Sequence, residues 1–137
     1  MSEPAEELVA RLGAGMVGVL TTRGTGERLL GRPIEFVSTP FTGSLWFICP
    51  DKARLIAQIQ LTSEVQVTFS GDDGWTVLGA KAHTANGAML PAEVRRCLDA
   101  AGEGRTAVQV VVLTARHWAA GVWVPDTELS SSDVVPD

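Results

Sequence analysis

Short apolar and alternating segments separated by tight turns make up most of this chain. Residues 64–70 alternate apolar and polar side chains, which is typical of a half-buried strand. Residues 16–22, 29–38, 44–49, 75–84 and 106–114 are rich in β-branched and aromatic side chains and also predict strands. Several of these segments are joined by turns of hairpin length, so we expect neighbouring strands to pair antiparallel.

Three segments show helical spacing instead, at residues 2–12, 52–60 and 90–101. Asp51 is the expected N-cap of the second helix. About six mostly antiparallel strands with short helices predict a mainly β, α+β fold built as a small closed or partly closed barrel. We expect one domain over residues 1–125 and a loose, acidic tail over residues 126–137.

The charge balance narrows the classes of function. A net charge of −5 argues against general binding to nucleic acid or to an anionic membrane. The N-terminus lacks the apolar region of a signal peptide, and no segment approaches the ~18 apolar residues of a membrane span. Two cysteines do not indicate a disulfide scaffold. A cytoplasmic location is therefore the expectation.

The start of the second predicted helix is the strongest candidate for chemistry. Lys52 and Arg54 fall in its first turn, where the helix already presents free N–H groups and a partial positive charge. Cations at this end are favourable only if an anion binds there. The pattern indicates a site for the phosphate of a nucleotide-type cofactor, although two solvated side chains would give the same pattern.

Other candidates are open to two interpretations each. Cys49 precedes a helix start, where a thiolate is stabilised, but it also fits a buried, inert position. Trp118 and Trp123 follow the last long strand and could line a ligand site or pack in the core. His83 and His117 have no flanking carboxylate cluster, so we expect no metal site. No G-x-S-x-G motif of a serine hydrolase is present.

The succession VLTT, GRPIEF, GSLWFICPDKARLIAQI and EVQVTFS resembles the FMN-binding split-barrel superfamily. The most similar group is that of the pyridoxamine 5′-phosphate oxidase-like proteins of the general-stress type. The resemblance extends in element order over residues 5–125 and is most specific over residues 29–70. It implies a six-stranded antiparallel split β-barrel that forms a homodimer, with FMN in two clefts at the subunit interface.

The resemblance also implies which residues meet the cofactor. One set lies on the second strand, a second at the end of the third strand, and a third at the helix start: Arg32, Pro33 and Ile34; Phe47, Ile48 and Cys49; Lys52, Arg54 and Leu55. The family commonly clamps the phosphate with a serine, an arginine and a lysine in succession. The matching positions here are Ala53, Arg54 and Leu55, so only the arginine is kept, and Lys52 stands three residues before the expected lysine. A late aromatic residue of the partner chain, matched by Trp118 or Trp123, often lines the cleft.

The expected function is therefore that of an FMN-binding flavoprotein, with an oxidoreductase activity on an unknown substrate. The alternative is a non-enzymatic dimeric module that has lost its ligand or binds haem or a deazaflavin. Haem would need an axial ligand such as His83 or His117. Oxidation of pyridoxamine phosphate itself is less expected, because the chain is short and its C-terminal segment is acidic. The sequence identifies no catalytic acid or base.

Overall fold

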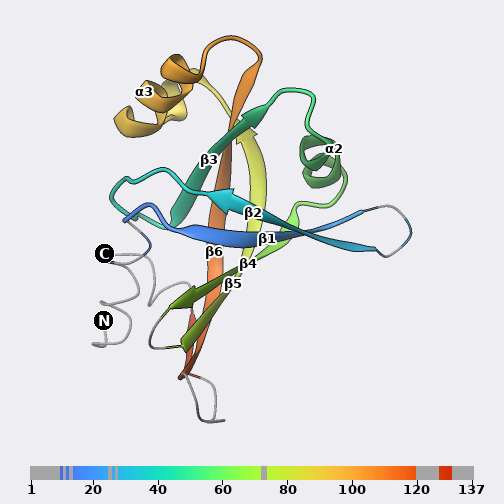
Figure 1. Cartoon of the computed structure of the whole chain (residues 1–137), viewed down its shortest axis with the longest axis vertical. Helices are drawn as coiled ribbons and strands as arrows, with labels where there is room; N and C mark the ends of the chain where they lie inside the picture. The colour runs from blue at the N-terminus through green and yellow to red at the C-terminus, as the bar shows by residue number, and fades with distance from the viewer. Residues whose placement is uncertain are drawn as a thin grey trace.

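A strongly curled antiparallel sheet makes up most of the protein (Figure 1). The structure is a computed structural model that describes residues 10, 12, 14–24, 26, 28–71, 74–119 and 127–130. Its strands are β1 Val17–Arg23, β2 Leu29–Glu35, β3 Ser44–Pro50, β4 Glu64–Gly71, β5 Gly74–Ala85, β6 Arg105–Ala119 and β7 Thr127–Ser130. The helical segments are α2 Arg54–Leu61, the short 3-10 helix η2 Gly87–Met89 and α3 Ala92–Ala101.

The strand order leaves the barrel open along one line. The sheet runs β2-β1-β4-β5-β6-β3, with β7 added beside β6, and every pairing is antiparallel. Although β3 follows β2 in the sequence, β3 pairs with β6, so β2 and β3 end the main path of the sheet, and each has an edge without a strand partner among the described residues. Just beyond β2, the amide of Val37 donates to the carbonyl of Trp46 at 2.8 Å. We call the line between β2 and β3 the seam, and it makes the fold a split barrel, as the sequence predicted.

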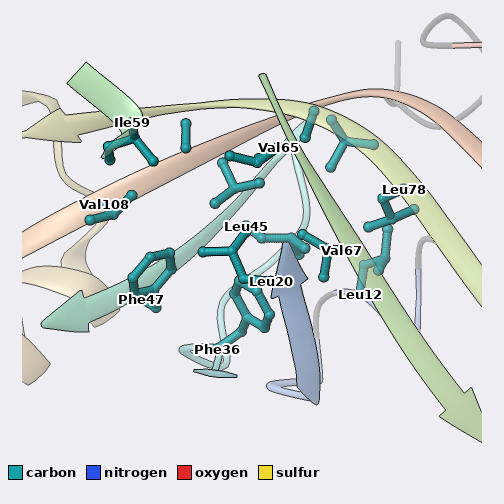
Figure 2. Close-up of a cluster of buried hydrophobic side chains, with 14 of the residues drawn as sticks. Leu12, Leu20, Phe36, Leu45, Phe47, Ile59, Val65, Val67, Leu78 and Val108 are labelled. Carbon is teal, nitrogen blue, oxygen red and sulfur yellow. The ribbon is translucent and has the colours of Figure 1, made fainter. Parts of the chain in front are cut away.

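The hydrophobic core fills the inside of the curled sheet (Figure 2). Alternation along β1 and β4 turns residues such as Leu20 and Val67 inward, where both are fully buried. The ring of Phe36 packs edge-on against Phe47 with centroids 5.8 Å apart. Gly18 is needed because a Cβ there would come within 2.6 Å of the ring of Phe69. Packing in the core therefore fixes the positions of the segments on either side of the seam.

A second, smaller core attaches α3 to the sheet. Leu90 and Val94 pack with Trp46 of β3 in a cluster separate from the main core. The hydroxyl of Thr39, in the connection between β2 and β3, donates to a carboxylate oxygen of Glu93 at 3.0 Å. This contact joins the start of α3 to the loop that closes one end of the seam.

Two predictions about element ends were wrong. The helix expected at residues 52–60 begins at Arg54, and its N-cap is Ala53, which makes no side-chain hydrogen bond to the helix. Asp51 instead accepts a hydrogen bond from the hydroxyl of Thr106, which holds it outside the helix. Residues 127–130, expected in a loose tail, form β7 against β6 because the long last strand offers them a free edge. Of the helix expected at residues 2–12, the structure describes only Ala10 and Leu12, and both are helical.

Candidate functional site

A cleft of about 520 Å³ lies at the seam. Residues 33–38 form one wall, and Phe47 and Ile48 of β3 form the other. Gly15 and Cys97 complete the lining, the latter contributed by α3. The cleft exists because the sheet does not close here, which leaves two strand edges facing a common space.

The lining of the cleft contains mainly apolar side chains, and polar groups contribute nearly half of its exposed surface. Ile34 and Ile48 are half-buried, whereas Phe47 is only 1% exposed and forms part of the floor. Pro33 has no N–H to donate, and it is tolerated because β2 is an edge strand. Glu35 provides a carboxylate to the lining. Such a surface suits a flat, largely apolar ring system with polar atoms along its edge.

Four of the residues singled out in the sequence meet in this cleft, namely Pro33, Ile34, Phe47 and Ile48. Cys49 does not line it, because its side chain is 7% exposed and packs in the main core. Burial raises the pKa of the Cys49 thiol, and the nearby carboxylate of Asp51 raises it further, while Arg105 opposes the shift. A thiol in this state is held protonated and is a poor nucleophile.

Arg32 does not line the cleft, because a hydrogen-bonded triangle holds its side chain against α2. Its guanidinium donates to the hydroxyl oxygen of Thr22 at 2.8 Å and to the side-chain carbonyl oxygen of Gln58 at 2.9 Å. The hydroxyl of Thr22 in turn donates to the same Gln58 oxygen at 2.8 Å. The triangle joins β1, β2 and α2, so it fixes the arginine next to the helix.

The start of α2 offers fewer free donors than the sequence predicted. The amide of Asp51 donates to the carbonyl of Gly104 at 2.9 Å, and the amide of Ala53 donates to the carbonyl of Pro50 at 3.0 Å. Leu55 is 4% exposed and belongs to the main core, so it contributes no surface to a ligand. Lys52 is exposed in the turn before the helix. A phosphate here would rely on side-chain cations more than on the helix terminus.

Arg54 is exposed and faces a second concavity, which we call the arginine hollow. The hollow has a volume of about 470 Å³ and lies between α2 and the β1–β2 hairpin. Its lining consists of Arg23, Gly24, Arg28, Leu30, Arg54, Ala57, Gln58, Leu61 and Thr62. The sequence analysis did not single out Arg23 or Arg28 as site residues. No local signal in the sequence marks them, because their approach to Arg54 depends on how the hairpin packs against α2.

The remaining candidates lie elsewhere. Trp118 is half-buried on β6 directly opposite Trp75, while Trp123 lies outside the described residues. His117 shares a hydrogen bond of 3.1 Å with the hydroxyl of Thr76, and His83 is exposed on β5. Within the described part of the chain, no group of three or more histidine, cysteine or acidic residues could hold a metal ion. No helix in that part is both long and apolar enough to cross a membrane.

An open antiparallel barrel with an apolar cleft between its two free edges defines a split-barrel protein. The sequence profile of the pyridoxamine 5′-phosphate oxidase-like family matches residues 3–128, and the chain belongs to that family. No curated protein sequence matches the chain.

Solved structures share this fold at low sequence identity. A protein related to general stress protein 26 from Clostridium acetobutylicum superposes with a TM-score of 0.74 at 8% identity, covering 98% of this chain and 99% of that one. General stress protein 26 from Bacillus anthracis gives 0.70 at 13% identity, with 94% and 99% covered. A heme binding protein from Mycobacterium smegmatis gives 0.75 at 16% identity, with 98% of this chain and 60% of that chain covered. At these identities the likeness shows the fold alone.

Proposed function

We propose that the protein binds a flavin, FMN, with the ring system in the cleft at the seam. The observation that carries this proposal is the meeting of Pro33 and Ile34 with Phe47 and Ile48 around one space of about 520 Å³. Small-molecule sites typically have volumes of about 300–1,000 Å³ and apolar walls with few polar groups. The cleft meets the volume criterion, and most of the side chains that line it are apolar.

Backbone groups at the edge of β2 would supply specificity for the flavin ring. An edge strand presents N–H and C=O groups that no neighbouring strand uses. The polar edge of a flavin carries alternating hydrogen-bond donors and acceptors, so it complements such a strand. The phosphate would be met by the cations Arg32, Lys52 and Arg54, in place of the family's complete clamp. Two of the three clamp positions, Ala53 and Leu55, have no polar side chain, which favours weaker binding than a full clamp gives.

A second copy of the chain is the proposed partner. The outer face of the sheet carries exposed apolar side chains, with Val17 at 63%, Val19 at 44%, Trp75 at 55% and Leu113 at 40% exposure. Val17 and Val19 point away from the core because they alternate with buried neighbours along β1. An apolar face of this kind is typical of an interface between subunits. A partner docked there would cover the sheet next to the seam.

The chemistry would come from the cofactor. A bound flavin supplies hydride and electron transfer, while the protein supplies position and electrostatics. Among the residues lining the cleft, Glu35 is the one that could accept a proton from a substrate. We therefore propose an oxidoreductase activity whose substrate enters the open side of the seam.

Haem is the second candidate, favoured by the fold shared with the heme binding protein from Mycobacterium smegmatis. A haem iron requires an axial ligand. The lining of the cleft contains no histidine among the described residues, and His117 is engaged with Thr76. The cleft therefore suits a flavin or a deazaflavin, which need no axial ligand, better than it suits haem.

An absorption spectrum of the purified protein, followed by titration with FMN, tests the proposal. We expect a bound-flavin band and quenching of flavin fluorescence. Ile48→Trp would fill the cleft and should weaken FMN binding at least about tenfold, whereas Met89→Trp, at a position 77% exposed and outside the cleft, should not. A well-folded protein that takes up no flavin at millimolar FMN would overturn the proposal, and a Soret band would favour haem instead.

A further inference from the structure

A pocket where β3 ends and β6 begins lies apart from the sites described above. It has a volume of about 330 Å³, and we call it the end pocket. Its lining comes from α2, α3, the last residues of β5 and the first residues of β6, and it shares no residue with the cleft or the arginine hollow. In Figure 1 the end of β3 lies between the two helices. The volume is near the lower limit of the about 300–1,000 Å³ typical of small-molecule sites, so a ligand would be small.

Strand pairing fixes two oppositely charged residues at this pocket. Pro50, the last residue of β3, is paired with Arg105, the first residue of β6. The amide of Asp51 donates to the carbonyl of Gly104 at 2.9 Å, which continues the β3–β6 contact by one residue. Asp51 and Arg105 both line the end pocket. The backbone of two paired strands therefore holds both residues at the same edge of the pocket.

The two charges do not neutralise each other through an ion pair. The carboxylate of Asp51 accepts a hydrogen bond from the hydroxyl of Thr106, which orients it. The guanidinium of Arg105 makes no hydrogen bond or ion pair within the part of the chain that the structure describes. Both charges lie near the thiol of Cys49, because, after burial itself, Asp51 raises the pKa of that thiol and Arg105 lowers it. The pocket therefore offers a fixed anion and an unpaired cation to a ligand.

The end pocket also has an apolar part. Ile56 of α2 is 8% exposed, Ala107 of β6 is 1% exposed, and Leu98 of α3 is half-buried. The exposed residues Gln60 and Asn86 add amide groups to the lining. A ligand that covered Ile56 and Leu98 would gain free energy by removing apolar surface from water. The lining therefore fits a small molecule with opposite charges at one end and an apolar group at the other.

We propose that the end pocket binds a small zwitterion with an apolar side chain, of the class of the free aliphatic α-amino acids. The ligand carboxylate pairs with Arg105, whose guanidinium can donate two parallel hydrogen bonds. The ligand ammonium group pairs with Asp51, and the apolar side chain covers Ile56 and Leu98. A ligand with a single charge would leave one of the two protein charges without a partner. This inference goes beyond the proposed function and does not depend on flavin binding.

L-leucine is the probe, and two analogues each remove one of its charges. 4-Methylpentanoate lacks the ammonium group, and L-leucinamide lacks the carboxylate but keeps its amine mostly protonated at about pH 6.5. Binding is measured by NMR on the full-length protein, with ligand up to about 50 mM, because partners this exposed support millimolar affinity. We expect saturable shifts of the amides of Asn86 and Leu98. Leucine should bind more tightly than either analogue, and more tightly than glycine, which lacks the side chain.

The variants R105Q and D51N assign each protein charge to one ligand charge. R105Q should weaken leucine and 4-methylpentanoate at least about threefold and leave leucinamide unchanged. D51N keeps an oxygen that can accept from Thr106, and it should weaken leucine and leucinamide but not 4-methylpentanoate. The matched controls are R96Q and D99N, because Arg96 and Asp99 are exposed on α3 and lie outside the pocket. Circular dichroism and the urea midpoint establish that each variant is folded.

The crossed pattern of the two variants separates recognition of a zwitterion from a structural role. A purely structural effect would weaken all three ligands in both variants, and that result overturns the proposal. Absence of saturable shifts with leucine, or glycine binding as tightly as leucine, also overturns it. FMN is titrated separately into the wild type. Failure to bind FMN together with the crossed pattern would refute the proposed function and leave the amino-acid site standing.

Discussion

Replacing Gln58 with leucine removes the acceptor at the centre of the triangle that joins α2 to the first two strands. The side-chain oxygen of Gln58 accepts one hydrogen bond from Thr22 at 2.8 Å and one from Arg32 at 2.9 Å. Leucine has a similar volume, so the packing is nearly kept while both bonds are lost. We expect Gln58→Leu to lower the free energy of unfolding.

The loss in free energy of unfolding depends on how well water can replace each lost hydrogen bond. Thr22 is 1% exposed, so its hydroxyl would be left without an acceptor, at a cost of about 1–3 kcal/mol. Arg32 is half-buried, so water can restore its lost bond, and this contact adds up to about 1 kcal/mol. The expected total is about 2 kcal/mol, which corresponds to a fall of about 1 M in the urea midpoint.

Equilibrium unfolding in urea, followed by tryptophan fluorescence, measures this difference. Gln58→Glu is the matched control, because it keeps an acceptor oxygen and places a carboxylate beside the arginine. We expect its midpoint to equal or exceed that of wild type. The reasoning would be refuted if Gln58→Leu unfolded at the wild-type midpoint, or if Gln58→Glu were destabilised as much as Gln58→Leu.

Three further predictions follow from contacts described above. Gly18→Ala should cost about 1–3 kcal/mol in urea unfolding, because the added methyl group meets a buried ring at 2.6 Å; a cost under about 0.5 kcal/mol would contradict the packing. The pKa of Glu93 lies below its usual 4.5, first because its own amide donates to the carboxylate and then because the hydroxyl of Thr39 does. Its stabilising effect is therefore present above the unfolded pKa and lost as pH falls through the lower folded pKa, so Thr39→Val should lose less stability than wild type between about pH 5 and pH 2. In the native protein at neutral pH, a thiol reagent should modify the exposed Cys97 rapidly and the buried Cys49 only after unfolding, and Cys97→Ser should abolish the rapid phase.

The architecture was accessible from the sequence because most of its signals are local. The alternation along residues 64–70 predicted the bounds of β4 to within one residue, and the hairpin-length turns predicted antiparallel pairing. Element ends depended on contacts between distant residues. Asp51 was expected to cap α2, but the hydroxyl of Thr106, on a strand that begins more than fifty positions later, binds its carboxylate instead.

The same difference between local signals and contacts of distant residues applies to the candidate site. Pro33 and Ile48 could be assigned to one ligand space because the family pattern on β2 and β3 marks them, and the fold brings both strands to one cleft. The arginine hollow escaped prediction, since nothing local relates Arg23 to Arg54. Their proximity depends on how the hairpin lies against α2, which is a property of tertiary packing.

The position of β6 has a consequence for how the chain acquires its structure during synthesis. This strand pairs with both β5 and β3. During synthesis, β3 (residues 44–50) therefore has no strand partner until β6 is made about sixty residues later. Until then the nascent polypeptide can pair only its earlier hairpins, and the apolar segment around Trp46 stays uncovered. Pairings of such long sequence separation form slowly. A truncation ahead of residue 105 would therefore yield an aggregation-prone fragment rather than a smaller stable unit.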